Sequence, residues 1–216
     1  MPSILCFGDS NTHGTLAHRH LGDKRRLEKP DRWPSVMSAA LGPDYDVIAE
    51  GHPGRTSVLE DPIEGVEKSG LRAIKILLES HRPIDLVIVM LGTNDTKARF
   101  GQSAVDIALG IQRIAMEISR SDCGPNGQPP HVMLVAPARI QETGIFKDIF
   151  AGAAAKSTAL PGYLKEVAEL HGFGFVDINT VAQVDPIDGI HLDVATHSAI
   201  GTHLASEVAA YLIESP

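Results

Sequence analysis

Five short runs of apolar residues recur along the chain, and segments with helical periodicity separate them. The runs are continuous and do not alternate with polar residues, which is typical of strands covered on both faces, as in a parallel sheet. We therefore predict strands at residues 4–7, 45–49, 85–91, 131–136 and 173–178.

Apolar residues three and four positions apart predict the helices between these strands. The third helix, for example, places Ile107, Ile111 and Ile114 on one face, and Ser103 can cap its first turn. We predict helices at residues 33–41, 65–80, 103–120, 157–171 and 196–213, although Pro161 disfavours the first turn of the fourth. The alternation predicts one domain over residues 1–216, a three-layer α/β/α fold with right-handed crossovers.

Two segments show neither the continuous apolar runs of strands nor the apolar spacing of helices. Residues 15–31 are polar and irregular, and residues 139–155 mix aromatic and aliphatic side chains with small ones. Long connections in a compact α/β domain are often functional. The first segment holds a basic cluster from His18 to Arg26, which Asp23 interrupts, and we expect it to be a solvated loop.

Composition narrows the possible partners. The 216 residues include 27 acidic and 19 basic ones, a net charge of −8, which disfavours nucleic acid as a partner. No apolar stretch approaches the roughly 18 residues of a membrane span, and the N-terminus lacks the pattern of a signal peptide. The two cysteines, Cys6 and Cys123, show no disulfide or CxxC spacing. We expect a cytoplasmic protein with no membrane partner, no cofactor and no bound metal.

Residues that can take part in chemistry, through a side chain or a backbone N–H, follow four of the predicted strands. Ser10 comes after the first, Gly54 after the second and Asn94 after the third, whereas Asp188 and His191 follow the fifth past a short loop. Ligands of an open parallel sheet bind beyond the carboxyl ends of its strands. We therefore expect a hydroxyl, a carboxamide, a carboxylate and an imidazole to meet at one edge of the sheet.

These groups together indicate acyl-transfer chemistry. A serine hydroxyl needs a base, histidine is the usual base near neutral pH, and a carboxylate holds the imidazole in one tautomer. We predict Ser10 as nucleophile, His191 as base and Asp188 as the partner of that base. Attack on an acyl carbon places negative charge on its oxygen. The side chain of Asn94 and the backbone N–H groups of Ser10 and Gly54 are the predicted donors to that oxyanion.

Four short blocks together resemble the SGNH, or GDSL-type, serine hydrolase superfamily. They are Phe7-Gly8-Asp9-Ser10, the glycine block ending at Gly54, Gly92-Thr93-Asn94-Asp95 and Asp188-Gly189-Ile190-His191, in the order of the family and across nearly the whole chain. The resemblance implies a flavodoxin-like, five-stranded parallel sheet and a serine esterase or acyltransferase with the same residue roles.

A narrower resemblance is to the bacterial arylesterases that also perform acyl transfer and perhydrolysis. It is carried by Ile-Leu-Cys-Phe-Gly-Asp-Ser, Met-Leu-Gly-Thr-Asn-Asp-Thr-Lys and Asp-Gly-Ile-His. It implies a small-molecule ester substrate with a short acyl group. The acyl-enzyme would pass that group to water, to an alcohol or to peroxide. The resemblance also implies a closed homo-oligomer, such as an octamer. Asn11 departs from this pattern because it stands where the family has leucine, and His52-Pro53 precede Gly54 without the usual asparagine.

The substrate pocket is predicted from apolar residues in loops near the strand ends and from the departure at Asn11. The predicted pocket residues are Asn11, Phe146, Ile149, Phe150 and Ile190. The alternative that the apolar ones are core or subunit contacts remains open. We expect Arg55 and Lys97, close to two motifs, to form solvated ion pairs rather than to steer substrate.

Two alternatives remain. A metal-dependent hydrolase would draw its ligands from a run near the C-terminus, although its two histidines are six residues apart and do not share a helical face. That run comprises Asp185, Asp188, His191, Asp193 and His197. A non-enzymatic flavodoxin-like binding domain would share the fold, but it does not explain why these polar groups converge.

Overall fold

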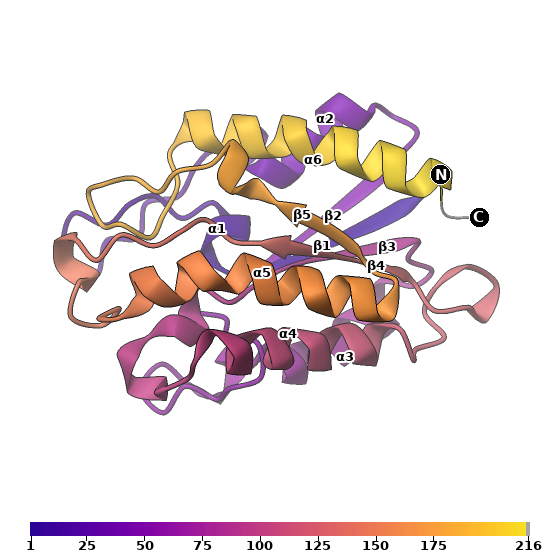
Figure 1. Ribbon diagram of the computed structural model, residues 1–216. Helices are drawn as coiled ribbons and strands as arrows, with labels where there is room; N and C mark the ends of the chain where they lie inside the picture. Colours follow the sequence, from indigo (N-terminus) through magenta and orange to yellow (C-terminus); the bar gives the residue numbers. More distant parts are fainter. Residues whose placement is uncertain (215–216) are drawn as a thin grey trace.

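The computed structural model describes residues 1–214 and is built around a five-stranded parallel sheet (Figure 1). The strands run in the order β2-β1-β3-β4-β5. They are β1 (Ser3–Gly8), β2 (Asp46–Gly51), β3 (Leu86–Met90), β4 (His131–Ala136) and β5 (Gly174–Asp177). Every predicted strand is present, with its ends shifted by no more than a few residues, and the predicted α/β/α fold is confirmed.

Helices cover both faces of the sheet (Figure 1). One layer holds α2 (Trp33–Leu41) and α6 (Val194–Glu214), which pack against each other. The other layer holds α3 (Gly70–His81), α4 (Ala104–Ile118) and α5 (Ala153–His171). A further helix of four residues, α1 (Ser10–His13), follows β1 directly. None of the helices within residues 1–214 combines the length and apolar character needed to cross a bilayer.

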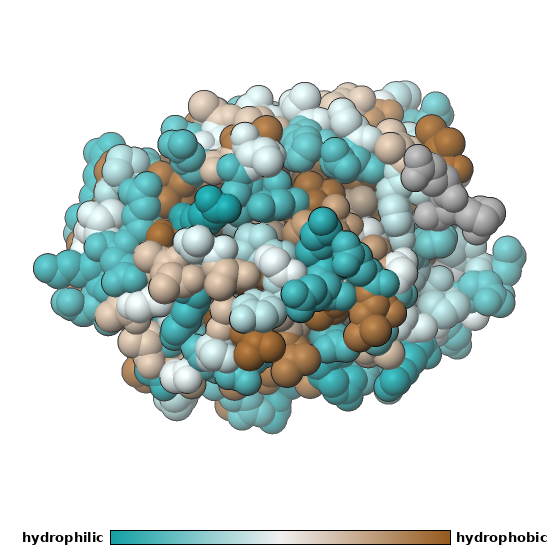
Figure 2. Space-filling model, in the orientation of Figure 1, coloured by the Kyte–Doolittle hydropathy of each residue, from teal (hydrophilic) through white to brown (hydrophobic). Residues whose placement is uncertain are grey.

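The two-sided burial of the sheet explains its continuous apolar runs. In β1, Leu5 and Phe7 belong to the core beneath α3, α4 and α5, whereas Ile4 and Cys6 belong to the core beneath α2 and α6. All four side chains are fully buried. Polar residues cover most of the surface seen in Figure 2, and apolar residues appear there in small groups.

The strand order changes direction at β1, and this places a cleft at the carboxyl end of that strand. The chain leaves β1 through α2 to reach β2 on one side, and it returns through α3 to β3 on the other side. Such a reversal opens a crevice beyond the carboxyl ends of the two central strands, where open α/β sheets bind ligands. Ser10 follows β1 and Asn94 follows β3, so both lie at this crevice.

Two helices, α3 and α5, begin four or more residues from their predicted starts. The helix predicted at 65–80 begins at Gly70, because residues 66–68 form a separate 3₁₀ turn after Gly65. The helix predicted at 157–171 begins earlier, at Ala153, and runs through Pro161. Proline removes one backbone hydrogen bond from a helix, but Pro161 and the adjacent Leu160 are buried, and their packing offsets that loss.

Candidate active site

The turn that ends β1 positions Ser10. Asp9 caps α1, with its carboxylate accepting a hydrogen bond from the backbone N–H of Asn11 at 2.9 Å. Ser10 is the first residue of the helix, and only 5% of its surface is exposed. The cap therefore holds a nearly buried hydroxyl at the mouth of the crevice.

The loop between β5 and α6 positions Asp188 and His191. One oxygen of Asp188, Oδ1, accepts hydrogen bonds from the backbone N–H groups of Ile190 and His191, each at 3.0 Å. Gly189 lies in the left-handed region at φ +73°, and a Cβ there would come within 1.9 Å of the Gln141 carbonyl oxygen. This tight turn therefore requires glycine.

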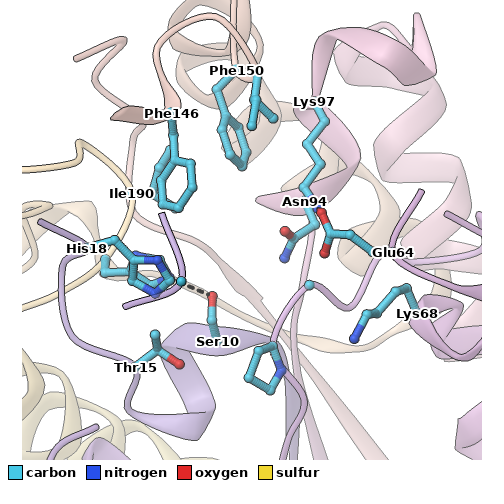
Figure 3. Close-up of a pocket in the computed structure, with 15 residues that line it drawn as sticks. Ser10, Thr15, His18, Glu64, Lys68, Asn94, Lys97, Phe146, Phe150 and Ile190 are labelled. Carbon is cyan, nitrogen blue, oxygen red and sulfur yellow. Dashed lines mark hydrogen bonds and ion pairs between the residues drawn. The ribbon is translucent and has the colours of Figure 1, made fainter. Parts of the chain in front are cut away.

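The three residues predicted as catalytic form one chain of hydrogen bonds. His191 Nδ1 lies 2.6 Å from Asp188 Oδ2, and His191 Nε2 lies 3.2 Å from Ser10 Oγ. Figure 3 marks the contact that reaches Ser10 with a dashed line. The two ends of the chain thus supply a hydroxyl and an imidazole within hydrogen-bond distance.

Asp188 is held in its charged form. Burial alone would raise the pKa of this carboxyl, but hydrogen bonds from the His191 ring and from the His191 and His18 backbones hold its pKa at about 2. An ionised Asp188 can only accept at Oδ2, so His191 Nδ1 carries the proton. His191 Nε2 is then free to accept the proton of Ser10.

The three predicted oxyanion donors border the same cavity as His191. Among the hydrogen bonds of the described residues, none comes from the backbone N–H of Ser10 or Gly54. Gly54 has φ +81°, and a Cβ there would lie 2.5 Å from Glu64 Oε2. The amide nitrogen of Asn94 donates to the Arg55 carbonyl at 3.1 Å and lies 3.4 Å from Asp9 Oδ2. The short contact fixes the Asn94 side chain, whereas the long one leaves its second N–H weakly engaged.

Arg55 and Lys97 are buried, so the predicted solvation of both was wrong, although Lys97 does form an ion pair. The guanidinium of Arg55 donates to the carbonyl oxygens of Gly8 and Glu50 and lies over the Phe7 ring, 4.3 Å from its centroid. It joins the ends of β1 and β2 beneath the site. Lys97 is 3% exposed, and its ammonium lies 2.5 Å from a carboxylate oxygen of Glu64. These loops are therefore fixed by buried charges.

The site opens into a cavity of about 320 Å³. An apolar wall is formed by Phe146, Ile149, Phe150 and Ile190, four of the five residues predicted for the pocket. A charged wall is formed by Glu64, Lys68 and Lys97. Figure 3 shows Phe146 and Ile190 on one side of Ser10, and Glu64 and Lys68 on the other.

Asn11, the fifth predicted pocket residue, does not border this cavity. Its side chain is buried and donates from Nδ2 to the Ile190 carbonyl at 3.1 Å. The contact joins α1 to the loop that carries His191. Asn11 therefore lies outside the cavity, at the contact between α1 and the loop that carries His191.

His18 is a site residue that the sequence did not reveal. It was expected in a solvated loop, but its ring borders the cavity and stacks on that of His191. The one signal that pointed to it was the length and irregularity of residues 15–31.

The run predicted as a possible metal site is not arranged as one. Within residues 1–214, no three His, Cys, Asp or Glu side chains are placed to hold an ion together. His197 is fully buried, and its Nδ1 accepts a hydrogen bond from the backbone N–H of Trp33 at 3.1 Å. It anchors the start of α2 to α6.

Comparisons with known proteins agree on one family. The model of the GDSL-like lipase/acylhydrolase family matches residues 6–199. No curated protein matches the chain. The solved structure of Est24, described as a carbohydrate acetylesterase from Sinorhizobium meliloti, is 35% identical over 98% of this chain and 100% of that chain, with a TM-score of 0.93. The inhibitor-bound aryl esterase of M. smegmatis is 34% identical over 97% of this chain and 99% of that chain, also with a TM-score of 0.93. The chain belongs to the GDSL-like lipase/acylhydrolase family.

Proposed function

We propose that the protein is a serine esterase that hydrolyses short-chain carboxylic esters through an acyl-enzyme on Ser10. The observation that carries the proposal is the hydrogen-bond chain from Asp188 through His191 to Ser10. Membership of an acylhydrolase family and the similarity to two solved esterases support it.

In the proposed reaction, Ser10 Oγ attacks the ester carbonyl carbon while its proton passes to His191 Nε2. The resulting imidazolium is stabilised by ionised Asp188. The tetrahedral intermediate collapses, the bond to the alcohol oxygen breaks, and His191 returns the proton to that oxygen. Water then attacks the acyl-enzyme in the same way and releases the acid.

The negative oxygen of the intermediate would be met by the backbone N–H groups of Ser10 and Gly54 and by the amide of Asn94. The weakly engaged N–H of Asn94 supports this role, since turning it toward a ligand gives up only a 3.4 Å contact. Donors that are in place before the charge develops contribute about 3 kcal/mol each to transition-state stabilisation.

The cavity supports a short acyl group. A volume of about 320 Å³ lies near the lower end of the range for small-molecule sites, and the apolar wall limits the space beside Ser10. The alcohol part would be aryl or alkyl, and an added alcohol or peroxide could replace water as the acyl acceptor.

The charged wall favours a second candidate, the ester of a polyhydroxylated alcohol. Glu64 and Lys97 offer acceptors and donors together at the cavity, and hydroxyl groups need both. Est24 is described as a carbohydrate acetylesterase, so acetylated carbohydrates are the class to test beside aryl esters.

The proposal is tested with purified protein and aryl esters of graded acyl length, from acetate to octanoate, with and without an added alcohol. We expect kcat/KM to fall as the acyl chain lengthens, and Ser10→Ala to lose essentially all turnover. An organophosphonate should label Ser10 alone. Full turnover by Ser10→Ala, or labelling at another residue, would overturn the assignment. A preference for octanoate would contradict the proposed acyl length.

A further inference from the structure

His18 contacts the proposed base, His191, and the carboxylate that orients it, Asp188. Its imidazole lies nearly parallel to that of His191, with an interplanar angle of 12° and 4.9 Å between ring centroids. Its backbone N–H donates to Asp188 Oδ2 at 2.8 Å, and that oxygen is also the one that binds His191 Nδ1. One residue of the 15–31 segment therefore contacts the His191 ring and the carboxylate that orients it.

The ring of Phe146 also packs near the ring of His191. The Phe146 ring is inclined by 62° to that of His191, with 6.2 Å between ring centroids, and its centroid lies 5.2 Å from that of His18. Figure 3 shows His18 and Phe146 on the same side of the cavity. The hydrogen bond to Asp188 fixes one atom of His191, but it does not by itself prevent the ring from rotating about that contact. Two flanking rings at contact distance restrict this rotation and keep Nε2 directed at Ser10.

The charge of His18 matters because His191 becomes a cation during the reaction. Burial and the neighbouring His191 lower the pKa of His18, and Asp188 opposes the shift. On its own segment, Asp23 and Arg25 act in opposite directions on the pKa of His18, and they pair with each other at 2.7 Å. His18 is thus neutral near pH 7, and a protonated His18 would oppose proton uptake by the ring stacked on it.

We propose that His18 is a positioning residue for His191, holding the base in line with Ser10, and that it does so productively only while it is itself neutral. This inference rests on the proposed function of the same site. His18 acts through His191, because His191 is the residue whose Nε2 contacts Ser10 Oγ.

Three substitutions distinguish the effect of the stacked ring of His18 from the effect of its protonation. Each of them keeps the backbone N–H that binds Asp188. His18→Phe keeps a stacking ring without a titrating nitrogen, whereas His18→Gln and His18→Ala remove the ring. His20→Ala is the matched control, because His20 is exposed two residues further along the same segment. Each variant is assayed with an aryl acetate from pH 5 to pH 9, and its folding is checked by thermal unfolding.

At pH 8, we expect His18→Gln and His18→Ala to lower kcat about 10- to 100-fold, as misplaced catalytic groups do, with a much smaller change in KM. His18→Phe should lose only about 2- to 3-fold in kcat, on the same reasoning. Because the pKa of His18 is lowered, its protonation should steepen the decline of wild-type log kcat/KM toward the acid end of this range. His18→Phe has no imidazole at this position, so its decline there should be shallower.

The outcomes distinguish the two proposals. A wild-type protein that hydrolyses no ester refutes the proposed function. Active wild-type protein with equal kcat in folded His18→Gln or His18→Ala refutes the positioning role. Identical acid limbs for wild type and His18→Phe refute the requirement for neutral His18. If His18→Ala fails to fold, the comparison of His18→Phe with His18→Gln decides the positioning role alone.

Discussion

Oδ2 of Asp188 accepts two hydrogen bonds at once, from His191 Nδ1 at 2.6 Å and from the His18 backbone at 2.8 Å. The carboxylate is fully buried, and these contacts, with that from the His191 backbone, hold its pKa at about 2. It therefore stays ionised across the pH range in which an imidazole titrates, and it fixes which nitrogen of His191 carries a proton.

Replacing Asp188 with asparagine should remove this control. The amide of Asp188→Asn can donate to Nδ1, which would leave the proton on Nε2 and block proton uptake from Ser10. We expect kcat for an aryl acetate to fall about 10⁴-fold. The new amide group cannot accept the hydrogen bond from the His18 backbone, so thermal unfolding is measured beside the kinetics. Asp193→Asn, an exposed change in the same segment, serves as the control in steady-state assays. A loss below tenfold for Asp188→Asn would argue against this role.

Asn94→Ala tests the proposed oxyanion donor. Because the amide would act on charge that develops in the transition state, kcat should fall about 10²- to 10³-fold, and KM should rise far less. Asn94 also donates to the Arg55 carbonyl, so the unfolding temperature is measured beside the kinetics. A variant that raises KM and keeps kcat would assign Asn94 to substrate binding instead.

Asn11→Leu restores the residue that the family pattern has after the serine, and it separates two roles for this position. The substitution removes the 3.1 Å hydrogen bond to Ile190, but it also removes a buried Oδ1 that has no partner within residues 1–214. These effects oppose each other, so stability should change by less than about 1 kcal/mol. A looser His191 loop should lower kcat several-fold. An effect on KM alone would favour the substrate-binding role predicted from the sequence.

His197 should make the folded protein sensitive to acid. Burial lowers its pKa to about 4, whereas an unfolded histidine titrates near 6.5. As pH falls from 6.5 to 4, this histidine becomes protonated in the unfolded state but stays neutral in the folded state. The free energy of unfolding therefore falls in this window, by at most about 3 kcal/mol, and is fully restored above pH 6.5.

His197→Asn supplies the comparison, because asparagine can accept the hydrogen bond from Trp33 without titrating. Urea unfolding of both proteins at pH 7, 6, 5 and 4 should show a shallower decline for the variant. Parallel declines would mean that other groups cause the acid sensitivity.

The sheet and the polar residues at its edge could be predicted because their signals are local. Continuous apolar runs such as 131–136 describe strands buried on two faces, and Ser10, Asn94 and His191 each follow a strand directly or past a short loop. The helix through Pro161 could not be predicted from local preference, because buried packing along α5 overrides it.

The roles of His18, Arg55 and Lys97 were hidden for a different reason. A charged or irregular segment is usually solvated, but Arg55 and Lys97 are buried and His18 is half-buried, through contacts with residues distant in the chain. His18 meets Asp188 across 170 positions, and Arg55 meets Gly8 across 47. No periodicity within the segment encodes such a contact, so it becomes visible only in three dimensions.

The wide separation of Ser10 and His191 along the chain has a consequence for synthesis. A growing polypeptide that has acquired Ser10 still lacks the imidazole until a further 181 residues have been added. On the proposed mechanism, every ribosome-bound intermediate is inert toward esters. Activity therefore begins only when the loop before α6 has emerged and His191 has come within hydrogen-bond distance of Ser10.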